Sequence, residues 1–342
     1  MLQETLKFEL PSVLNASMPP ERRGVRRDQV KMMVLDRNTG QTSHDHFFNL
    51  DDYLRTGDVL VLNSSRTVPA ILKSELLRIG KLIYSEIEIR LARRINECTW
   101  EALAVTERVE NGDSLVFSPS LTGEVLSAPN NTPFITIQFN QRGSDLYNEI
   151  YAIGEPVRYE YINIPWGLDY YQTVFAIHPG SVEMPSAGRA FSWELLFKLQ
   201  KKGIKLVFIQ LHTGLSYLLD DKWEHSPTEN SEEYNIPAEA WEDILQAKMN
   251  GKRVIAVGTT VVRAMETAAG NGCLSGWTNL YIKQNYKAKI ADGIITGMHE
   301  PEASHLDMLS AFIKQKDLFN AYQEAISLGY LWHEFGDMNL IL

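Results

Sequence analysis

The sequence predicts an α/β domain built from both ends of the chain, discontinuous because a small antiparallel β-barrel domain is inserted between them. Three observations support this prediction: a strand–turn–helix unit at residues 252–269, short strands without helical periodicity over residues 68–139, and helical patterns that return after residue 151. Short strands at regular spacing are typical of a barrel, and strands alternating with helices of a parallel sheet. We therefore expect an α/β domain at residues 1–67 and 150–342 and a barrel at residues 68–149.

The strand–turn–helix unit carries the clearest local pattern. Residues 253–257 form an apolar run that ends at Gly258, as in a buried strand, and Thr259 and Thr260 follow as candidate helix caps. The apolar residues that come next share one helical face: Val261, Val262, Met265 and Ala269. The turn presents hydroxyls and free N–H groups at a helix N-terminus, where polar or anionic ligands bind. No dinucleotide fingerprint or phosphate-binding loop is present, so a plain structural turn is the alternative.

The segments before the barrel read as strands separated by turns. Apolar runs at residues 30–35 and 58–62 predict buried strands, and the second ends at the polar stretch 63–66.

Within residues 68–139, the stretch 82–91 alternates strictly, with Ile83, Ile87, Ile89 and Leu91 on one side. Further barrel strands are expected at residues 100–106, 114–117, 124–127 and 134–139.

The segments after the barrel predict helices with recognisable ends. Ser192 caps a helix at residues 193–202, and a strand follows at 205–210. Pro237 starts a helix that ends at residue 250, because Gly251 follows. Ser304 and Asp307 resemble a capping box for a helix at residues 305–314, and a last helix is expected at 320–328.

Composition limits the classes of function. The net charge of −10 argues against general coating of nucleic acid, but four arginines crowd one segment that could contact phosphates: Arg22, Arg23, Arg26 and Arg27. A solvated charged face is the alternative.

The two cysteines, Cys98 and Cys273, are far apart, which indicates a reducing compartment. No apolar run of membrane-spanning length and no signal-peptide pattern is present, so we expect a cytoplasmic protein without membrane contact.

Polar clusters fall at strand ends or loops of the expected α/β domain. They are residues 63–66, 171–173, 183–188, 212–214 and 259–263, together with His299. Strand ends converge on one crevice in an open α/β sheet, so we expect these clusters to line a shared site. Histidines in loops are more often merely exposed, and neither His44 with His46 nor His299 with His305 has zinc-site spacing, so no metal site is expected.

Taken together, these residues resemble the S-adenosylmethionine:tRNA ribosyltransferase-isomerase family of queuosine biosynthesis, nearly end to end. The resemblance rests on motifs that occur in order: Phe8-Glu9-Leu10-Pro11, Val34-Leu35-Asp36-Arg37, Asn63-Ser64-Ser65-Arg66-Thr67-Val68-Pro69-Ala70, Tyr171-Gln172-Thr173-Val174-Phe175-Ala176, Pro185-Ser186-Ala187-Gly188, Gly258-Thr259-Thr260 and Gly336-Asp337. The family pattern implies the same architecture, an α/β domain with an inserted barrel.

The resemblance implies an unusual reaction. The ribosyl part of S-adenosylmethionine, a co-substrate, would be transferred to the aminomethyl group of a 7-deazaguanine precursor at the anticodon of tRNA. Adenine and methionine would leave and epoxyqueuosine would form, without a metal. The sulfonium acidifies the C5′ protons, so a base must approach one of them, and adenine needs a proton or hydrogen bonds as it leaves. The sequence leaves the oligomeric state open.

The implied site residues follow from these chemical needs. Histidines suit proton transfer near neutral pH, and the phosphates of tRNA need arginines or lysines. The candidate catalytic residues are His212, His299, Glu183 and Arg66. The candidate substrate-binding residues are Asn63, Tyr171, Gln172, Thr173, Ser186, Gly188, Gly214, Thr259, Thr260 and Arg263. The candidate RNA-binding residues are the four arginines between positions 22 and 27.

The sequence departs from the family pattern close to these residues. Arg189 and Ala190 stand where the family usually has Leu-His, and Asn230 stands where it has another histidine. A cation at position 189 would repel the sulfonium of S-adenosylmethionine unless it points away or pairs with an acid. Either the same reaction runs with altered side chains, or the chain is a divergent paralogue that binds an adenosyl ligand or RNA without this catalysis. Because Arg189 and Ala190 replace Leu-His, we expect slow turnover with S-adenosylmethionine and precursor tRNA. Replacing Arg189 with leucine and Ala190 with histidine should increase the rate of adenine release.

Overall fold

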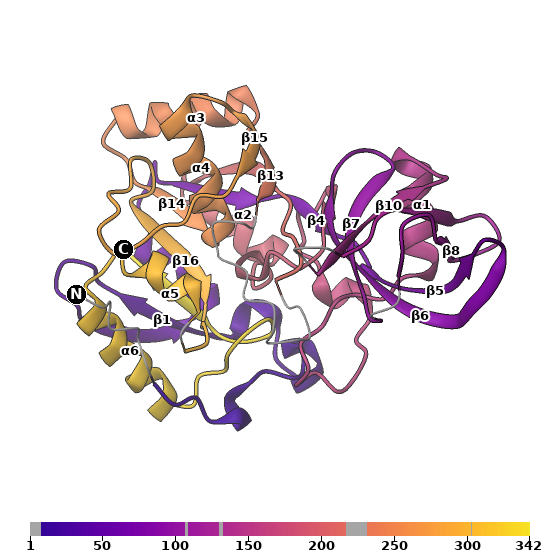
Figure 1. Ribbon diagram of the computed structural model, residues 1–342. Coiled ribbons are helices and arrows are strands. Elements are labelled where there is room, and N and C mark those ends of the chain that lie inside the picture. The colour runs from indigo at the N-terminus through magenta and orange to yellow at the C-terminus, as the bar shows by residue number, and fades with distance from the viewer. Residues whose placement is uncertain (1–7, 107–108, 130–132, 217–230, 302) are drawn as a thin grey trace.

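The computed structural model describes residues 8–106, 109–129, 133–216, 231–301 and 303–342. It has two parts, an α/β domain made from both ends of the chain and a barrel to one side of it (Figure 1). This confirms the fold class predicted from the sequence. No helix in the described ranges is long and apolar enough to cross a membrane.

A nine-stranded mixed sheet forms the centre of the α/β domain, in the order β15-β13-β12-β3-β14-β16-β17-β1-β2. Its middle strands β12, β3, β14 and β16 run parallel, and β16 pairs antiparallel with β17. The strands are β1 Lys31–Leu35, β2 Thr42–His46, β3 Val59–Asn63, β12 Lys205–Leu211, β13 Glu232–Asn235, β14 Val254–Val257, β15 Ser275–Thr278, β16 Gly293–Gly297 and β17 Met338–Ile341. The predicted strands at residues 30–35, 58–62, 205–210 and 253–257 are all present.

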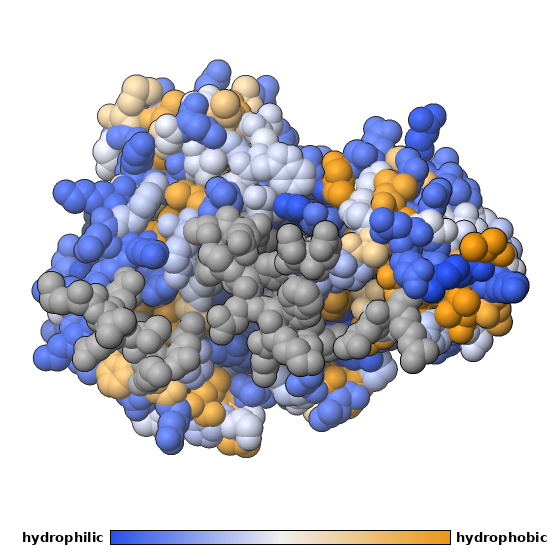
Figure 2. Space-filling model, viewed as in Figure 1, coloured by the Kyte–Doolittle hydropathy of each residue, from blue (hydrophilic) through white to orange (hydrophobic). Residues whose placement is uncertain are grey.

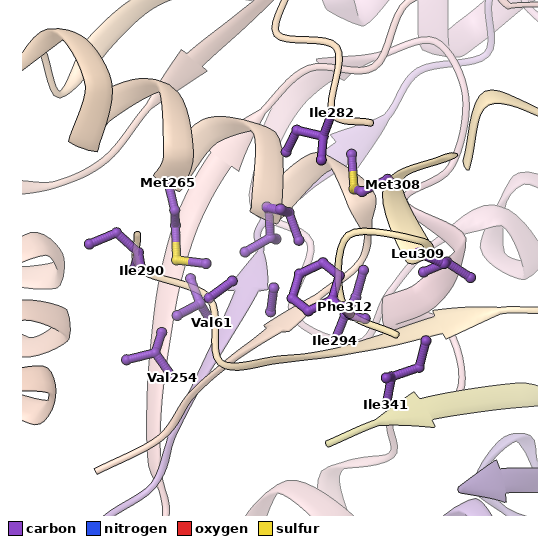
Figure 3. Close-up of a cluster of buried hydrophobic side chains, with 14 of the residues drawn as sticks. Val61, Val254, Met265, Ile282, Ile290, Ile294, Met308, Leu309, Phe312 and Ile341 are labelled. Atoms are coloured by element: carbon purple, nitrogen blue, oxygen red, sulfur yellow. The ribbon is translucent and has the colours of Figure 1, made fainter. Parts of the chain in front are cut away.

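The sheet is buried on both faces, which explains why its middle strands are continuous apolar runs rather than alternating ones. On one face, Val61 and Val254 pack beneath Met265 of α4, and Ile294 lies beside Phe312 (Figure 3). On the other face, Leu60 and the neighbouring strands pack against α2 and the short helix η4. Alternate residues of one strand thus enter different cores, as the two-residue period of a strand requires.

Helices cover the sheet, with α3 and α4 on the face shown in Figure 3 and α2 on the other. The helices are α1 Gly143–Ile153, α2 Trp193–Lys201, α3 Ala238–Met249, α4 Thr259–Asn271, α5 Ser304–Leu309 and α6 Gln315–Ser327. The Ser192 cap of α2 is confirmed, because its hydroxyl accepts a hydrogen bond from the N–H of Leu195. The capping box at Ser304 is wrong: Ala303 is the cap residue, and α5 ends five residues before the predicted end.

Short 3-10 helices and one small ribbon complete the α/β domain. The 3-10 helices are η1 Ser12–Leu14, η2 Pro20–Arg23, η3 Arg27–Gln29, η4 Phe47–Tyr53, η5 Leu168–Tyr171 and η6 Ser186–Gly188. The ribbon pairs β4 Ser65–Thr67 with β11 His178–Ser181 in parallel. It holds the chain that enters the barrel next to the chain that has left it, so the two halves of the domain meet at this point.

The barrel is closed by six antiparallel strands in the order β10-β7-β6-β5-β8-β9. These strands are β5 Ile71–Arg78, β6 Lys81–Arg94, β7 Thr99–Ala104, β8 Ser114–Val116, β9 Thr122–Ser127 and β10 Phe134–Phe139. Ile87, Ile89 and Leu91 are buried as their alternation predicts, but Ile83 is 41% exposed, since the register of β5 and β6 shifts at Leu76. Figure 2 shows further hydrophobic residues on the outer surface of the barrel.

Helix α1 packs on the barrel, with Leu146 and Ile150 in the same buried cluster as the barrel strands. The sequence pattern did not indicate this helix, which crosses the expected domain boundary at residues 149 and 150. The domain boundary at residues 149 and 150 therefore stays a proposal. By its packing, α1 belongs with the barrel. Between Val68 and Phe139, the described residues form strands and no helix.

Candidate active site

A cavity of about 770 Å³ lies where the strands of the sheet end, facing the barrel. Three of its walls are formed by residues just after the carboxyl ends of strands β12, β14 and β16. These residues are Gly214, Gly258 and Met298, respectively. The barrel closes another side with residues of β6, β7 and β10, among them Arg93, Glu101 and Phe134. A crevice at the carboxyl ends of parallel strands is the usual ligand site of an open α/β sheet.

The turn between β14 and α4 forms one wall. Gly258 has φ 97° and ψ 154°, a conformation essentially restricted to glycine, and an added Cβ would lie 3.3 Å from Cβ of Ala187. Gly258 is the cap residue, so the prediction that Thr259 or Thr260 caps the helix is wrong: both are its first residues, and both line the cavity. Their N–H groups and hydroxyls lie at the positive end of the helix dipole.

Arg263 lines the cavity one turn further along α4. Its guanidinium forms an ion pair with the buried Glu232 of β13 and donates a hydrogen bond to the Leu280 carbonyl at 3.2 Å. Burial raises the pKa of Glu232, and the charge of Arg263 opposes this. The ion pair thus fixes the direction of Arg263 while keeping a cation in the cavity wall.

Two stacked imidazoles form the opposite wall. The rings of His299 and His305 are 4.6 Å apart between centroids and parallel within 1°. His299 Nε2 lies 2.7 Å from the Thr296 hydroxyl. Burial lowers the pKa of His299 well below its ordinary value, helped by the charges of His305 and His333. His305 is accessible from the cavity, but the surrounding protein and Arg263 lower its pKa to about 4. Both rings are therefore uncharged proton acceptors at neutral pH.

A third wall combines aromatic and acidic side chains. The ring of Tyr159 lies beside that of His333, with centroids 5.5 Å apart and a tilt of 33°, and His333 contacts Glu300 at 2.6 Å. His333 has a left-handed backbone with φ 70°, which is uncommon for a residue other than glycine. Glu183 and Glu334 also line this wall, and Glu183 accepts hydrogen bonds from the backbone and hydroxyl of Ser216. This wall thus offers acidic and aromatic side chains to a ligand.

The structure brings about half of the predicted site residues together. Those that line the cavity are Glu183, Ser186, Gly214, Thr259, Thr260, Arg263 and His299. Those that do not line it are Arg66, His212, Asn63, Tyr171, Gln172, Thr173 and Gly188. The expectation that all of them share one crevice is corrected accordingly, and the catalytic or binding role of each residue stays a prediction.

Three of the seven residues outside the cavity, His212, Asn63 and Gln172, form hydrogen bonds between segments that lead to its walls. His212 Nδ1 lies 2.7 Å from the Ser65 hydroxyl, which in turn lies 2.6 Å from that of Ser181. The Asn63 amide bonds to the backbone N–H and carbonyl of Leu211, which joins β3 to β12. The Gln172 side-chain amide accepts a hydrogen bond from the Thr67 N–H and donates one to the Thr67 carbonyl. These contacts connect the strands that lead to the cavity.

The other residues outside the cavity are packed or lie on the surface. The side chain of Tyr171 is buried against Phe335, with ring centroids 5.3 Å apart. Thr173 and Gly188 pack together so closely that a Cβ on the glycine would lie 2.9 Å from Thr173 Cγ2. The guanidinium of Arg66 lies 5.0 Å from the ring centroid of Tyr151.

Arg189 points away from the cavity. Its side chain is 3% exposed and forms an ion pair with Glu21 at 2.8 Å. It also donates a hydrogen bond to the Tyr170 carbonyl at 2.8 Å and lies over the ring of Phe335. The repulsion of a sulfonium, expected if this cation faced the ligand, therefore does not arise. Asn230, the other departure, lies outside the described residues.

The four clustered arginines also make contacts within the protein. Arg23 donates to the carbonyls of Met18 and Phe335 and is half-buried, and Arg27 pairs with Glu21 at 3.0 Å. Arg22 is exposed and lies over the rings of Trp166 and Tyr170. The exposed Arg26 pairs with Asp28 at 2.8 Å. Arg22 and Arg26 are thus the two whose side chains reach the surface.

Sequence reasoning missed several cavity residues. Tyr159, His333 and Glu334 were not singled out, and His305 was considered only as a metal ligand. They lie in loops or at the start of a short helix, where no periodicity marks them. The one available signal was position, because His333 and Glu334 come just before the matched motif Gly336-Asp337.

The fold and the cavity define a class of protein: an α/β protein with an inserted barrel and a polar ligand site at its strand ends. The chain belongs to the queuosine biosynthesis protein family, whose model matches residues 3–341. This confirms the resemblance found in the sequence.

Its relatives match along almost their whole length. A protein of Carboxydothermus hydrogenoformans is 36% identical, with 98% of each chain covered, and one of Clostridioides difficile is 37% identical, with 100% of each covered. Both carry the name S-adenosylmethionine:tRNA ribosyltransferase-isomerase. The crystal structure of S-adenosylmethionine tRNA ribosyltransferase from Thermotoga maritima is similar, with a TM-score of 0.56, 28% identity and coverage of 98% of this chain and 99% of that one.

Proposed function

We propose that this chain is an S-adenosylmethionine:tRNA ribosyltransferase-isomerase. It transfers the ribosyl part of S-adenosylmethionine to the aminomethyl group of a 7-aminomethyl-7-deazaguanine base at the anticodon of tRNA, in the cytoplasm. The products are epoxyqueuosine in the tRNA, adenine and methionine. The observation that carries the proposal is the cavity at the strand ends, which joins uncharged imidazoles, carboxyl groups and a helix N-terminus in a chain that matches enzymes of this name throughout.

The cavity fits the charges of S-adenosylmethionine. Its volume of about 770 Å³ lies within the usual range for pockets that hold small ligands. Thr259, Thr260 and Arg263 offer hydrogen-bond donors and a cation to the carboxylate of the ligand. Glu183 offers a carboxyl group to its cationic groups, the ammonium and the sulfonium. The ligand therefore has a complementary group for each of its charges.

The uncharged histidines supply the base that the reaction needs. The sulfonium acidifies the C5′ protons of the ribosyl group, and a neutral imidazole in contact with that carbon can accept one of them. When His299 Nε2–H donates to the Thr296 hydroxyl, its Nδ1 keeps a free lone pair. Because the pKa values of His299 and His305 are lowered, both rings stay uncharged throughout the neutral range.

The tRNA contact is assigned to the exposed members of the arginine cluster. Arg22 and Arg26 reach the surface and suit phosphates, whereas Arg23 and Arg27 hold the N-terminal segment in place. Phosphate contacts supply much of the affinity for nucleic acid, and an acidic protein needs such a local positive surface.

A second candidate function is binding of an adenosyl ligand or RNA without the transfer reaction. The observation that favours it is Ala190, which replaces a histidine of the family pattern. The two candidates are separated by incubating the purified protein with S-adenosylmethionine and tRNA that carries the precursor base, and measuring free adenine by chromatography. The enzyme releases adenine only when both substrates are present. Binding of S-adenosylmethionine in calorimetry without adenine release would establish the second candidate instead.

A further inference from the structure

Glu334 lies next to the position of the missing histidine. Ala190 and Glu334 line the same small cavity, which adjoins the main one, since Ser186 and His333 line both. Glu334 lines the main cavity as well, so its side chain stands between the two. The carboxyl group of Glu334 thus borders both the main cavity and the small cavity that Ala190 lines.

The carboxyl group of Glu334 has an unusual environment. Within the described part of the chain, its Oε2 is buried and has no hydrogen-bond partner. Burial raises the pKa of Glu334 well above its ordinary value, and the negative charge of Glu183 raises it further. Arg189 acts in the opposite direction, and Arg27 and His333 are the other charged or titratable groups around the small cavity. Glu334 therefore retains a proton under conditions in which an ordinary glutamate has lost it.

Four other titratable groups of the cavity are poor proton donors at neutral pH. The pKa values of His299 and His305 are lowered, so these rings are uncharged at neutral pH and have no imidazolium proton to give. Burial raises the pKa of Tyr159 away from neutrality, which makes its hydroxyl a weaker acid. Glu232 is held as an ion pair by Arg263. In many active sites, the acid is the group whose pKa is raised and the base is a group whose pKa is lowered. Here the raised pKa is that of Glu334, and the lowered values are those of the two histidines.

Two aromatic rings that a purine could contact lie near Glu334 in the main cavity, tilted by 33° to each other. Tyr159 and His333 both line the main cavity and lie beside each other, with ring centroids 5.5 Å apart. Tyr161 does not line the cavity but stacks on Tyr159, with ring centroids 5.6 Å apart. Heteroaromatic rings stack on aromatic side chains, and a carboxylic acid at the edge can donate to one ring nitrogen while accepting from an amino group.

We propose that Glu334 is the proton donor to the departing adenine, which lies against Tyr159 and His333. This inference rests on the proposed function. The bond between C1′ of the ribosyl group and N9 of adenine breaks, and its electron pair goes to the adenine. The Glu334 O–H bond breaks at the same time, and its proton goes to a ring nitrogen, so that neutral adenine leaves and a carboxylate remains. Water returns the proton to Glu334 before the next turnover.

The test is the variant Glu334→Gln, which keeps the size and the hydrogen bonds of the side chain but has no acidic proton. We expect kcat for adenine release to fall roughly 10²- to 10⁴-fold, the usual effect of losing a general acid. The dissociation constant for S-adenosylmethionine in calorimetry should change little, which also shows that the variant is folded. Glu242→Gln, on the exposed side of α3, is the matched control and should keep the activity of the unchanged protein.

The pH profile separates a proton donor from a merely structural residue. In the unchanged protein, kcat should fall as the pH rises through the pKa of Glu334, and this decline should be absent from the residual activity of Glu334→Gln. Equal kcat in the two proteins, or the same high-pH decline in both, would overturn the inference while leaving the proposed function intact.

A binding measurement tests the adenine site without catalysis. Calorimetry with free adenine should show weaker binding at high pH for the unchanged protein and a smaller pH dependence for Glu334→Gln. Adenine binding that is identical in the two proteins at every pH would overturn the inference. If instead the unchanged protein releases no adenine at all, the proposed function fails, and this binding result still decides whether Glu334 contacts adenine.

Discussion

Replacement of Arg189 by leucine should destabilise the fold and leave binding of S-adenosylmethionine nearly unchanged. The guanidinium is 3% exposed and holds Glu21 at 2.8 Å and the Tyr170 carbonyl at 2.8 Å. The sequence pattern alone suggested the opposite, that this cation faces the ligand and that leucine would help. The substitution therefore distinguishes an Arg189 side chain that is buried against Glu21 from one that faces the ligand.

The size of the effect follows from these contacts. Removing one partner of a fully buried ion pair costs about 3–5 kcal/mol, but Glu21 is 31% exposed and retains Arg27 at 3.0 Å. Water and Arg27 thus compensate part of the loss, while the Tyr170 carbonyl loses a charged donor worth about 1.5–3 kcal/mol. We expect the free energy of unfolding to fall by roughly 2–4 kcal/mol.

The loss should depend on pH. Burial raises the pKa of Glu21, but the hydrogen bond and the charge of Arg189 outweigh it, so the pKa lies below the ordinary 4.5. A group whose folded-state pKa is lowered stabilises the fold above its unfolded pKa, and this stabilisation is lost as the pH falls through the folded-state pKa. The destabilisation caused by Arg189→Leu should therefore be smaller in acid than at neutral pH.

Urea unfolding measures the stability, and calorimetry with S-adenosylmethionine measures the binding. The exposed Arg55→Leu is the control, expected to change stability by no more than about 0.5 kcal/mol. An unchanged unfolding free energy together with roughly tenfold tighter binding of S-adenosylmethionine, about 1.4 kcal/mol, would refute the assignment of Arg189 as a structural residue.

Three further predictions concern the cavity wall, the RNA contact and the stability of the N-terminal segment. Gly258→Ala should lower stability by about 1–3 kcal/mol because its backbone conformation is essentially restricted to glycine, whereas Gly270→Ala, in open space on the same helix, should not; equal melting temperatures for the two variants would contradict this. Replacing Arg22 and Arg26 together by alanine should weaken tRNA binding and reduce the slope of log K against log salt by about 1.5–2, the value for two lost phosphate contacts. Arg23→Ala should instead lower stability, because its guanidinium holds two backbone carbonyls. Filter binding at several salt concentrations checks the RNA predictions, and an unchanged slope in the double variant would remove this surface from the contact.

The fold was predictable where a local pattern repeats. The apolar run before Gly258 and the helical face after it mark one βα unit, and alternation at Ile87, Ile89 and Leu91 marks a barrel strand. Helix α1 and strand β5 were missed, since their burial depends on packing against barrel strands that are distant in sequence. Local periodicity carries no information about such partners.

The candidate site was predictable only in part. Some residues that follow a predicted strand, such as Gly214 and Thr259, do line the cavity. Polar residues in other loops look the same in the sequence whether they face a ligand or, like Gln172, bond to a neighbouring backbone. Arg189 pairs with Glu21, 168 residues away, and no local rule could identify that partner.

The most direct test of the proposed function is the product in the tRNA itself. The purified protein is incubated with S-adenosylmethionine and tRNA that carries 7-aminomethyl-7-deazaguanine, and the tRNA is digested to nucleosides for mass spectrometry. We expect the precursor nucleoside to be replaced by epoxyqueuosine, in an amount equal to the adenine released. A precursor nucleoside that stays unchanged, while S-adenosylmethionine and tRNA both bind, would contradict the proposed reaction.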